Sequence, residues 1–449
     1  MIIFFLIAVA LGLFYSILQL QIPGLWKFLL VVAEMLMVNY IFIKKYKQQS
    51  EMGLVLLKSK KGLALIENLA KYDKAFKFIA DVGASMSYGV LSFFIMRKNF
   101  SPLTFIIGII LLFGISIFVA PFALAFLVQV VNVGSTSKAA VDIGTSADVA
   151  FYMVSGMLLV GGLFLFILFG ITFYGLTVLK ALITTIAFGS GAISQTAAGG
   201  TLLLPGVNLP FFEGIAALAI VMVVHEGAHA ILAKIAKVPI LSSGIVLFGI
   251  IPIGAFVEPD EQKLAKSDNE SHTRVLVAGP TANLITSIVF FMLFVSFFFL
   301  TPAYREQGLL VRSGMEMGTV IYGFNGETLD LNNIKIDLPK NSEVSIMTNM
   351  GEIVRKTDEN GKIGITYTVL TKESIATKYS VPGFDFIYTV LGLGLALNFV
   401  VGAVNLLPIP LFDGYRLIDV NLKNKMIVKA VSYGALGMFI LNFLPLLFH

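Results

Sequence analysis

The sequence predicts a polytopic α-helical membrane protein of about 9–10 spans with one small, strand-rich soluble insert. Two observations predict this class. Of the 449 residues 57% are hydrophobic and only 13% are charged, whereas soluble domains carry about 25% charged residues. Apolar runs close to the roughly 20 residues that cross a bilayer recur along the chain, and the longest polar stretch lies near 301–382.

Composition also excludes several classes of site and partner. The chain has no cysteine, which excludes disulfides and Cys-based zinc or iron sites. The net charge of +5 is modest and fits basic cytoplasmic loops better than a nucleic-acid surface. We therefore predict the lipid bilayer, and no nucleic acid, as a partner. The first residues lack a charged segment and a cleavage site, so they predict a retained helix.

Residues 1–200 are predicted to form an N-terminal transmembrane region. Residues 1–20 and 24–43 are its first two spans. A basic loop at 44–80 follows, with lysines in excess, and is assigned to the cytoplasm. Apolar residues recur there at helical spacing, which predicts a helix lying either on the inner membrane surface or on the protein's own cytoplasmic face.

The rest of this region fits more than one number of crossings. Residues 82–96 form a marginal span, and 103–131 predict one helix kinked at Pro121. The apolar run 150–188 fits two short spans, or one span with a re-entrant segment. If the basic loop is cytoplasmic and the span at 210–237 enters from outside, an odd number of crossings must lie between them. Three crossings satisfy this, and residues 172–188 would then not span.

The span 210–237 contains the motif His225-Glu226-Gly227-Ala228-His229. On a helix the two histidines lie one turn apart on one face. Two imidazoles at this spacing bind one zinc ion, with Glu226 beside the open position as general base. Ionisable groups inside an apolar span are costly and indicate function. The alternative is a transporter helix whose histidines bond polar neighbours.

A third protein ligand is needed to complete a zinc site. His272 lies in a charged stretch and His449 is the last residue, so a carboxylate is the better candidate. Asp413 closes the run 405–414, in which Pro408 and Pro410 forbid a regular helix. Broken backbone at membrane depth lines a cavity or lies inside protein. The alternative is an ordinary turn with a solvated Asp413.

The chain resembles the site-2 proteases, which are intramembrane zinc metalloproteases. The resemblance covers about residues 200–449 and rests on HEGAH at 225–229, AGPTAN at 278–283, an insert near 305–380 and NLLPIPLFDG at 405–414. The phrase at 253–261 is similar to archaeal members. Membership implies His225, His229 and Asp413 as zinc ligands and Glu226 as catalytic base. The chain has LFDG where many bacterial members have NPDG, but it keeps the Asp-Gly.

Residues 201–300 are predicted to form the first part of a catalytic core. Prolines and glycines in 238–259 favour a β-hairpin beside the site, whose free edge could hold an unwound substrate. A charged loop at 258–274 and a span at 275–300 follow. For Asn283 two roles stay open: a hydrogen bond to the substrate backbone, or orientation of a ligand. Gly279 and Ala282 fit close helix packing.

Residues 301–382 alternate like strands and contain Asn-Gly turn signals, which predicts a PDZ-like extracytoplasmic domain. Residues 383–449 complete the core with spans at 384–404 and 426–448. For Asn405 we consider a hydrogen bond to the oxyanion and, alternatively, bracing of the turn. Basic residues after Asp413 and at Lys234 and Lys237 place the site towards the cytoplasm of a multi-pass cell-membrane protein.

The predicted function is zinc-dependent hydrolysis of peptide bonds within or near membrane spans. The resemblance implies that the partners are membrane-anchored, single-span regulatory proteins that another protease has already shortened. The alternative is a multi-span transporter or metal permease, because broken helices and polar residues at membrane depth also describe transporters. The insert and the lack of a visible inverted repeat argue against it.

Overall fold

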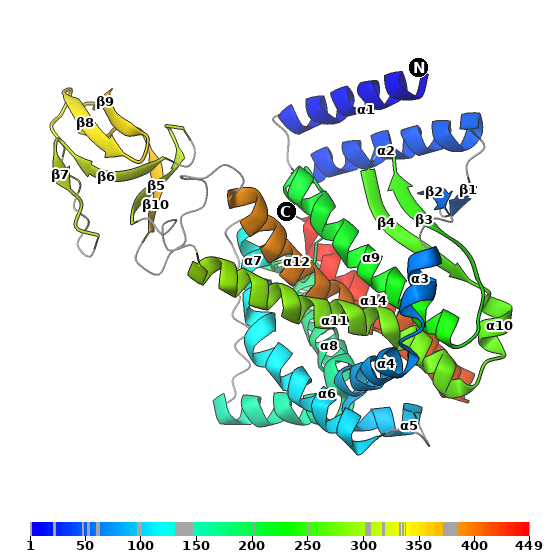
Figure 1. The fold of residues 1–449 in the computed structure, drawn as a ribbon. Coiled ribbons are helices and arrows are strands. Elements are labelled where there is room, and N and C mark those ends of the chain that lie inside the picture. Colours follow the sequence, from blue (N-terminus) through cyan, green and yellow to red (C-terminus); the bar gives the residue numbers. More distant parts are fainter. Residues whose placement is uncertain are drawn as a thin grey trace. The chain divides into compact units, whose positions relative to one another are not determined.

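The computed structural model describes residues 2–448 except 21–23, 47–48, 52–53, 60–62, 97–100, 131–146, 202, 250, 301–306, 317–318, 332–333, 335, 337 and 371–383. The chain divides into two compact units (Figure 1). The first unit combines Met1–Phe291 with Gly392–His449, and the second comprises Met292–Leu391. The first unit holds all the residues that the sequence nominated for catalysis.

The N-terminal region opens with two helices, as predicted: α1 (Ile2–Gln19) and α2 (Gly24–Tyr46). The basic loop is more ordered than predicted. It contains β1 (Gln49–Glu51), β2 (Leu54–Ser59), α3 (Leu63–Leu69) and the start of α4 (Asp73–Tyr88). Of the two open alternatives for its helix, packing on the protein is the one seen, because Ile66 is buried and Glu67 pairs with Lys234 at 2.7 Å.

The central helix of the N-terminal region is α4, whose residues 80–88 are all buried. Glycines set its distance from two neighbours: a Cβ at Gly83 would lie 1.8 Å from Thr281 Oγ1, and one at Gly108 would lie 2.4 Å from Ser85 Cβ. The short turn η1 (Gly89–Leu91) and α5 (Ser92–Met96) continue it. Because Gly83 and Gly108 have no side chains, α4 can approach its neighbouring helices closely.

The run that the sequence predicts as one helix kinked at Pro121 contains a π turn just before that proline. α6 (Pro102–Gly114) leads into the π turn η3 (Ile115–Val119), which leads into α7 (Ala120–Val130). Proline has no N–H to donate to the preceding turn, so the regular hydrogen-bond ladder cannot continue there.

The long apolar run forms α8 (Ala147–Phe188), followed by η4 (Ala192–Gln195). Its break falls at Gly162, with φ 62° and ψ −159°, and the segment 172–188, which three crossings would leave non-spanning, follows this break within α8. A Cβ at Gly162 would lie 2.5 Å from the backbone of Ser87 and Tyr88. Only glycine tolerates both this conformation and this close approach.

The core of the first unit contains α9 (Phe211–Ile235), the hairpin β3 (Ile240–Phe248) and β4 (Ile251–Pro259), α10 (Glu261–Ala265) and α11 (Asn269–Leu300). The predicted β-hairpin is therefore present. The predicted charged loop at 258–274 was too long, because α10 and the first turn of α11 lie within it. Asp260 caps α10 by accepting a hydrogen bond from Lys263 N.

The hairpin belongs to a four-stranded antiparallel sheet in the order β1-β2-β3-β4. β2 pairs with β3 from Val55↔Leu247 to Ser59↔Ser243, so a segment of the basic loop covers one edge of the hairpin. Lys58 reaches Glu258 at 2.7 Å. The hydrogen bonds from Lys58 and Ser242 hold the pKa of the Glu258 carboxyl below its usual value. β4 is the last strand of this sheet and packs alongside α9 (Figure 1).

The second unit is rich in strands. It contains β5 (Gly308–Ser313), β6 (Val320–Phe324), β7 (Glu327–Thr328), β8 (Glu343–Thr348), β9 (Gly351–Lys356) and β10 (Thr366–Leu370). The sheet order is β10-β5-β6-β8-β9, with β7 paired to β6. Alternate residues, among them Val344 and Ile346, are fully buried in its core. A strand-rich insert is confirmed, while its likeness to a PDZ domain stays a prediction.

The chain ends with α12 (Phe384–Val404), α13 (Asp413–Asn421), α14 (Lys425–Phe443) and η6 (Leu444–Leu447). Within the described residues, seven helices are long and apolar enough to cross a membrane. They are Asp73–Ile95, Pro102–Ala125, Phe151–Phe188, Phe211–Ile235, Asn269–Phe297, Phe386–Val404 and Lys425–Leu447. The predicted class, a polytopic membrane protein with a strand-rich insert, is thus confirmed.

Candidate metal centre

Three predicted ligands from two distant parts of the chain meet in the first unit. His225 and His229 lie one turn apart on α9, and Asp413 is the first residue of α13. Asp413 Oδ2 lies 3.1 Å from His225 Nε2 and 3.2 Å from His229 Nε2. The two Nε2 atoms are themselves 3.2 Å apart. The three side chains therefore converge on one point.

This donor set fits a zinc ion. Two imidazole nitrogens and one carboxylate oxygen are a catalytic zinc set that leaves a fourth position open. Ligands about 2.0–2.1 Å from a tetrahedral zinc lie roughly 3.3 Å from one another, close to the separations of 3.1 and 3.2 Å seen here. Burial alone would raise the pKa of the Asp413 carboxyl, but the contacts with His229 and His225 hold its pKa well below its usual range.

The loop before Asp413 aims this carboxylate. α12 ends at Val404, two prolines follow it, and Gly414 N donates to the carbonyl of Asn405 at 2.8 Å, which closes the turn. A Cβ at Gly414 would lie 2.0 Å from the Leu406 carbonyl, so only glycine fits. Leu411 has a φ of 86°, a left-handed conformation that costs a non-glycine residue about 1–2 kcal/mol. This strain lies two residues from the carboxylate.

Helix α11 supports both imidazoles through Val275 and the AGPTAN segment at 278–283. A Cβ at Gly279 would lie 2.3 Å from His229 Nε2 and 2.5 Å from His225 Nε2, so glycine makes room for the rings. His229 Nδ1 lies 2.6 Å from the Val275 carbonyl. A carbonyl accepts only, so this nitrogen carries the proton and Nε2 has its lone pair towards the convergence point.

The contacts of Asn283 fit the second of its two predicted roles, the orientation of a ligand. Its Oδ1 lies 2.6 Å from His225 Nδ1, and its side chain is fully buried. Its Nδ2 donates to the Val221 carbonyl at 3.2 Å and to Asn398 Oδ1 at 3.0 Å. The sequence analysis missed Asn398, although a lone asparagine between Gly394 and Gly402 in an apolar span was the available signal.

A cavity of about 410 Å³ opens at the centre. Besides the three ligands, Glu226, Val257, Asn405 and Arg416 line it. Asn405 therefore both lines the cavity and braces the turn through its carbonyl. Arg416 Nη2 bonds Glu261 Oε2 at 2.6 Å across two of the lining elements.

The predicted base Glu226 faces this cavity next to the hairpin. Its Oε2 accepts a hydrogen bond from Val257 N at 3.1 Å. This N–H points away from β3, along the outer edge of the last strand of the sheet. The edge that the sequence nominated for substrate binding thus contacts the predicted catalytic base directly.

The N-terminal region braces this arrangement through α4. Arg274 donates to both carboxylate oxygens of Asp81, at 2.7 and 2.9 Å, and both side chains are largely buried. Arg274 directly precedes Val275 on α11. A bidentate pair fixes orientation as well as distance, so α4 holds the helix that carries the partners of both histidines.

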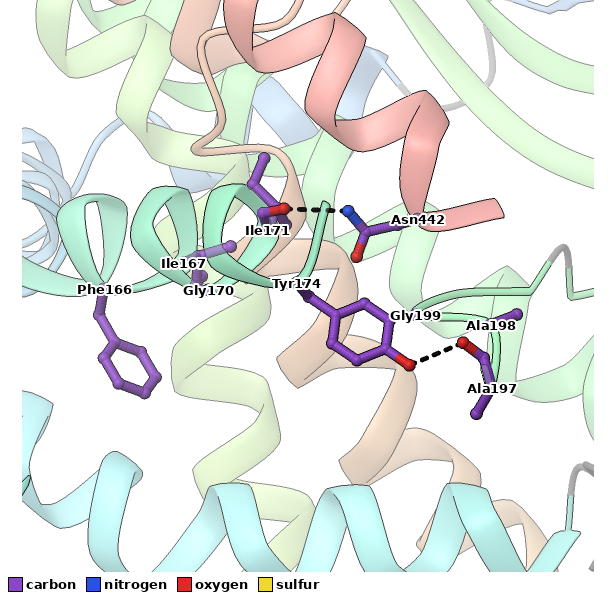
Figure 2. A pocket seen from close by; sticks show the side chains of 9 residues that line it. All are labelled: Phe166, Ile167, Gly170, Ile171, Tyr174, Ala197, Ala198, Gly199 and Asn442. Atoms are coloured by element: carbon purple, nitrogen blue, oxygen red, sulfur yellow. Dashed lines mark hydrogen bonds between the residues drawn. The ribbon is translucent and has the colours of Figure 1, made fainter. Parts of the chain in front are cut away.

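A second cavity, of about 420 Å³, lies elsewhere in the first unit (Figure 2). It is lined by Phe166, Ile167, Gly170, Ile171, Tyr174, Ala197, Ala198, Gly199 and Asn442. Tyr174 donates to the Ala197 carbonyl and Asn442 to the Ile171 carbonyl (Figure 2). Its described lining includes no imidazole, carboxylate or amine.

The chain is similar to a known protein over about half of its length. It is 31% identical over 242 residues to an uncharacterized protein of Methanocaldococcus jannaschii. This alignment covers 51% of the chain and 62% of that protein, so the chain spans less than two thirds of the relative's length. No solved structure matches the chain.

The model of peptidase family M50 matches residues 213–445. This match contains both histidines, the base and the third ligand, and it runs through the insert between them. Proteases of this family are zinc metalloproteases of the site-2 type, which agrees with the His-His-Asp group. Because the match covers more than half of the chain, the chain belongs to peptidase family M50, the intramembrane metalloproteases of the site-2 type.

Proposed function

We propose that this protein is a zinc-dependent endopeptidase that cuts single-span membrane proteins within or near their spans. The observation that carries the proposal is the convergence of His225, His229 and Asp413, with Glu226 beside them in one cavity. His225, His229 and Asp413 would hold the zinc. The alternative of a transporter has no support from the family match.

Zinc bound there supplies a Lewis acid that polarises the scissile carbonyl and makes a water molecule more acidic. Glu226 takes a proton from the attacking water, whose oxygen bonds to the peptide carbonyl carbon. When the C–N bond breaks, the same carboxyl returns the proton to the leaving amine. Asn405 lines the cavity on the side of the turn, and its amide donates to the oxyanion that forms during attack.

The outer edge of β4 is the proposed binding edge for the substrate. A helical span must first unwind, because its carbonyls are already hydrogen-bonded within the helix. An extended segment then pairs with β4 by strand addition. A carbonyl of the substrate segment then accepts a hydrogen bond from Val257 N, which in this structure donates to Glu226. Neighbouring strands lie about 4.8 Å apart, so the hairpin and α9 separate to admit the segment.

We further infer that the site faces the cytoplasm. Lys234 lies in the last turn of α9 and Lys237 follows it, while the ligands lie in the same half of the helix. Positive residues next to a span favour the cytoplasmic side. The strand-rich insert then lies outside, where it restricts substrates that still carry a large external domain.

The test uses purified, zinc-loaded protein in liposomes with a single-span peptide. We expect products whose new ends, identified by mass spectrometry, map inside the span or within a few residues of it. The His225→Ala variant, which lacks a ligand, should give none. Intact peptide after incubation with zinc-loaded protein, together with zinc flux into the liposomes, would instead support a permease.

A further inference from the structure

One face of α12 approaches α11 unusually closely. Gly394, Asn398 and Gly402 follow one another at intervals of one turn and so share that face. A Cβ at Gly394 would lie 2.3 Å from the ring of Phe290, and one at Gly402 would lie 3.0 Å from the Pro280 carbonyl. Glycines above and below Asn398 therefore let its amide reach across to α11.

The orientation of the Asn398 amide is set within its own helix. Its Nδ2 donates to the Gly394 carbonyl at 2.7 Å, and its side chain is fully buried. An amide has one donor and one acceptor end. With the donor end held by a backbone carbonyl, Oδ1 is left facing α11, where it accepts from Asn283 Nδ2 at 3.0 Å.

Asn283 is thereby fixed in turn. The Asn398 oxygen and the Val221 carbonyl accept the two hydrogens of its Nδ2. Its Oδ1 then faces His225 Nδ1 at 2.6 Å. Two acceptors cannot share a hydrogen bond, so His225 carries its proton on Nδ1 and keeps the Nε2 lone pair for a metal.

The two histidines differ in how this is achieved. His229 Nδ1 faces the carbonyl of Val275, which is always an acceptor. His225 Nδ1 faces a side-chain amide, which a 180° rotation would convert from acceptor to donor. At His225 that rotation is opposed by the two acceptors of Asn283 Nδ2, the Val221 carbonyl and Asn398 Oδ1, and Asn398 is the one that belongs to a side chain.

We propose that Asn398 is a positioning residue of the metal centre: it locks the Asn283 amide and so holds His225 in the tautomer that presents Nε2 to the metal. This inference rests on the proposed zinc site. Partners that orient a metal ligand typically change metal affinity 10–100-fold when they are removed. Asn398 acts through Asn283 and touches neither the metal site nor the substrate.

The chain offers a matched control in Asn442. It is also buried, its Nδ2 also donates to a carbonyl four residues earlier, that of Met438, and it also bonds a second helix through the Ile171 carbonyl (Figure 2). It lies at the second cavity, away from the histidines. Asn398→Leu and Asn442→Leu thus remove the same kind of interaction at two places.

The first measurement is nitrogen NMR of metal-free protein labelled with ¹⁵N in histidine, which gives few signals because the chain has four histidines. We expect the Nδ1-protonated form of His225 in the wild type and in Asn442→Leu, and a mixture of tautomers in Asn398→Leu. An unchanged His225 signal in Asn398→Leu overturns the proposal. This readout needs no bound metal, so it decides the role of Asn398 even if the wild type binds no zinc, which would refute the proposed function instead.

The second measurement is the zinc dissociation constant, by competition with a chelator. Asn398→Leu should raise it about 10–100-fold, and Asn442→Leu should leave it within roughly a factor of two. In an Asn283→Ala background, Asn398→Leu should cause no further change. Equal losses in both backgrounds would show that Asn398 acts only through the fold, which also overturns the proposal. If Asn398→Leu does not fold, Asn398→Ala, with the smaller side chain, is measured in the same two ways.

Discussion

Substitution of Gly279 tests whether the imidazoles of His225 and His229 pack as closely against α11 as the structure shows. In Gly279→Ala the new Cβ would lie 2.3 Å from His229 Nε2 and 2.5 Å from His225 Nε2. Real Cβ contacts are not shorter than 3.0 Å. The rings must therefore withdraw by at least 0.7 and 0.5 Å respectively, or α11 must move away from α9.

Either movement weakens the centre. If the rings withdraw, their Nε2 atoms leave the point at which they meet Asp413. If α11 moves, His229 loses the Val275 carbonyl and His225 loses Asn283. We expect zinc affinity to fall about 10–100-fold, the range found when a ligand loses its supporting partner. Cleavage of a membrane peptide at limiting zinc should fall with it.

Gly227→Ala is the matched control, because a Cβ at Gly227 would meet no atom within 4 Å. It lies between the two histidines on α9, and alanine favours a helix over glycine by about 1 kcal/mol. The assay is the zinc dissociation constant of both variants with a competing chelator. Wild-type affinity in Gly279→Ala would show that the imidazoles do not pack against this glycine, and the described site would be wrong.

Three further predictions concern the third ligand, the binding edge and the insert. Asp413→Ala should lower zinc content, since two imidazoles alone do not complete the site; full occupancy would remove Asp413 from the ligand set. Val257→Pro deletes the edge N–H and should raise KM by up to about 10-fold, because one neutral hydrogen bond contributes about 0.5–1.5 kcal/mol, while Val257→Ala keeps the N–H and should not; an equal KM for both would refute strand addition at β4. Replacing residues 301–381 with a Gly/Ser linker should preserve cleavage of a shortened substrate and raise cleavage of one with a large external domain; equal loss on both would mean that the insert braces the core.

The motifs predicted which side chains converge, because the geometry that each motif imposes is local. The HEGAH spacing places two imidazoles on one helix face whatever surrounds them, and two prolines prevent a regular helix before Asp413 in any context. The β-hairpin was also readable, since prolines and glycines in an apolar stretch exclude a straight helix. The class of membrane protein followed from composition alone.

What the sequence could not predict depends on contacts between distant segments. β2 joins the hairpin across about 190 residues of chain, and no local pattern states that register. The break in α8 falls at Gly162 because α4 presses against it there, which an apolar run rich in glycine does not reveal. For Asn398 the sequence shows only a lone polar residue in an apolar span; its role depends on the place where α12 crosses α11.

The central claim is that Glu226 performs proton transfer at a zinc centre built by its neighbours. It is tested most directly by measuring zinc content and cleavage of a membrane peptide on the same preparation of wild type and Glu226→Gln. Glutamine keeps the size of the side chain but cannot take the proton from water. The account predicts equal zinc content and a turnover at least about 100-fold lower in the variant. Near-normal turnover in zinc-loaded Glu226→Gln would contradict it.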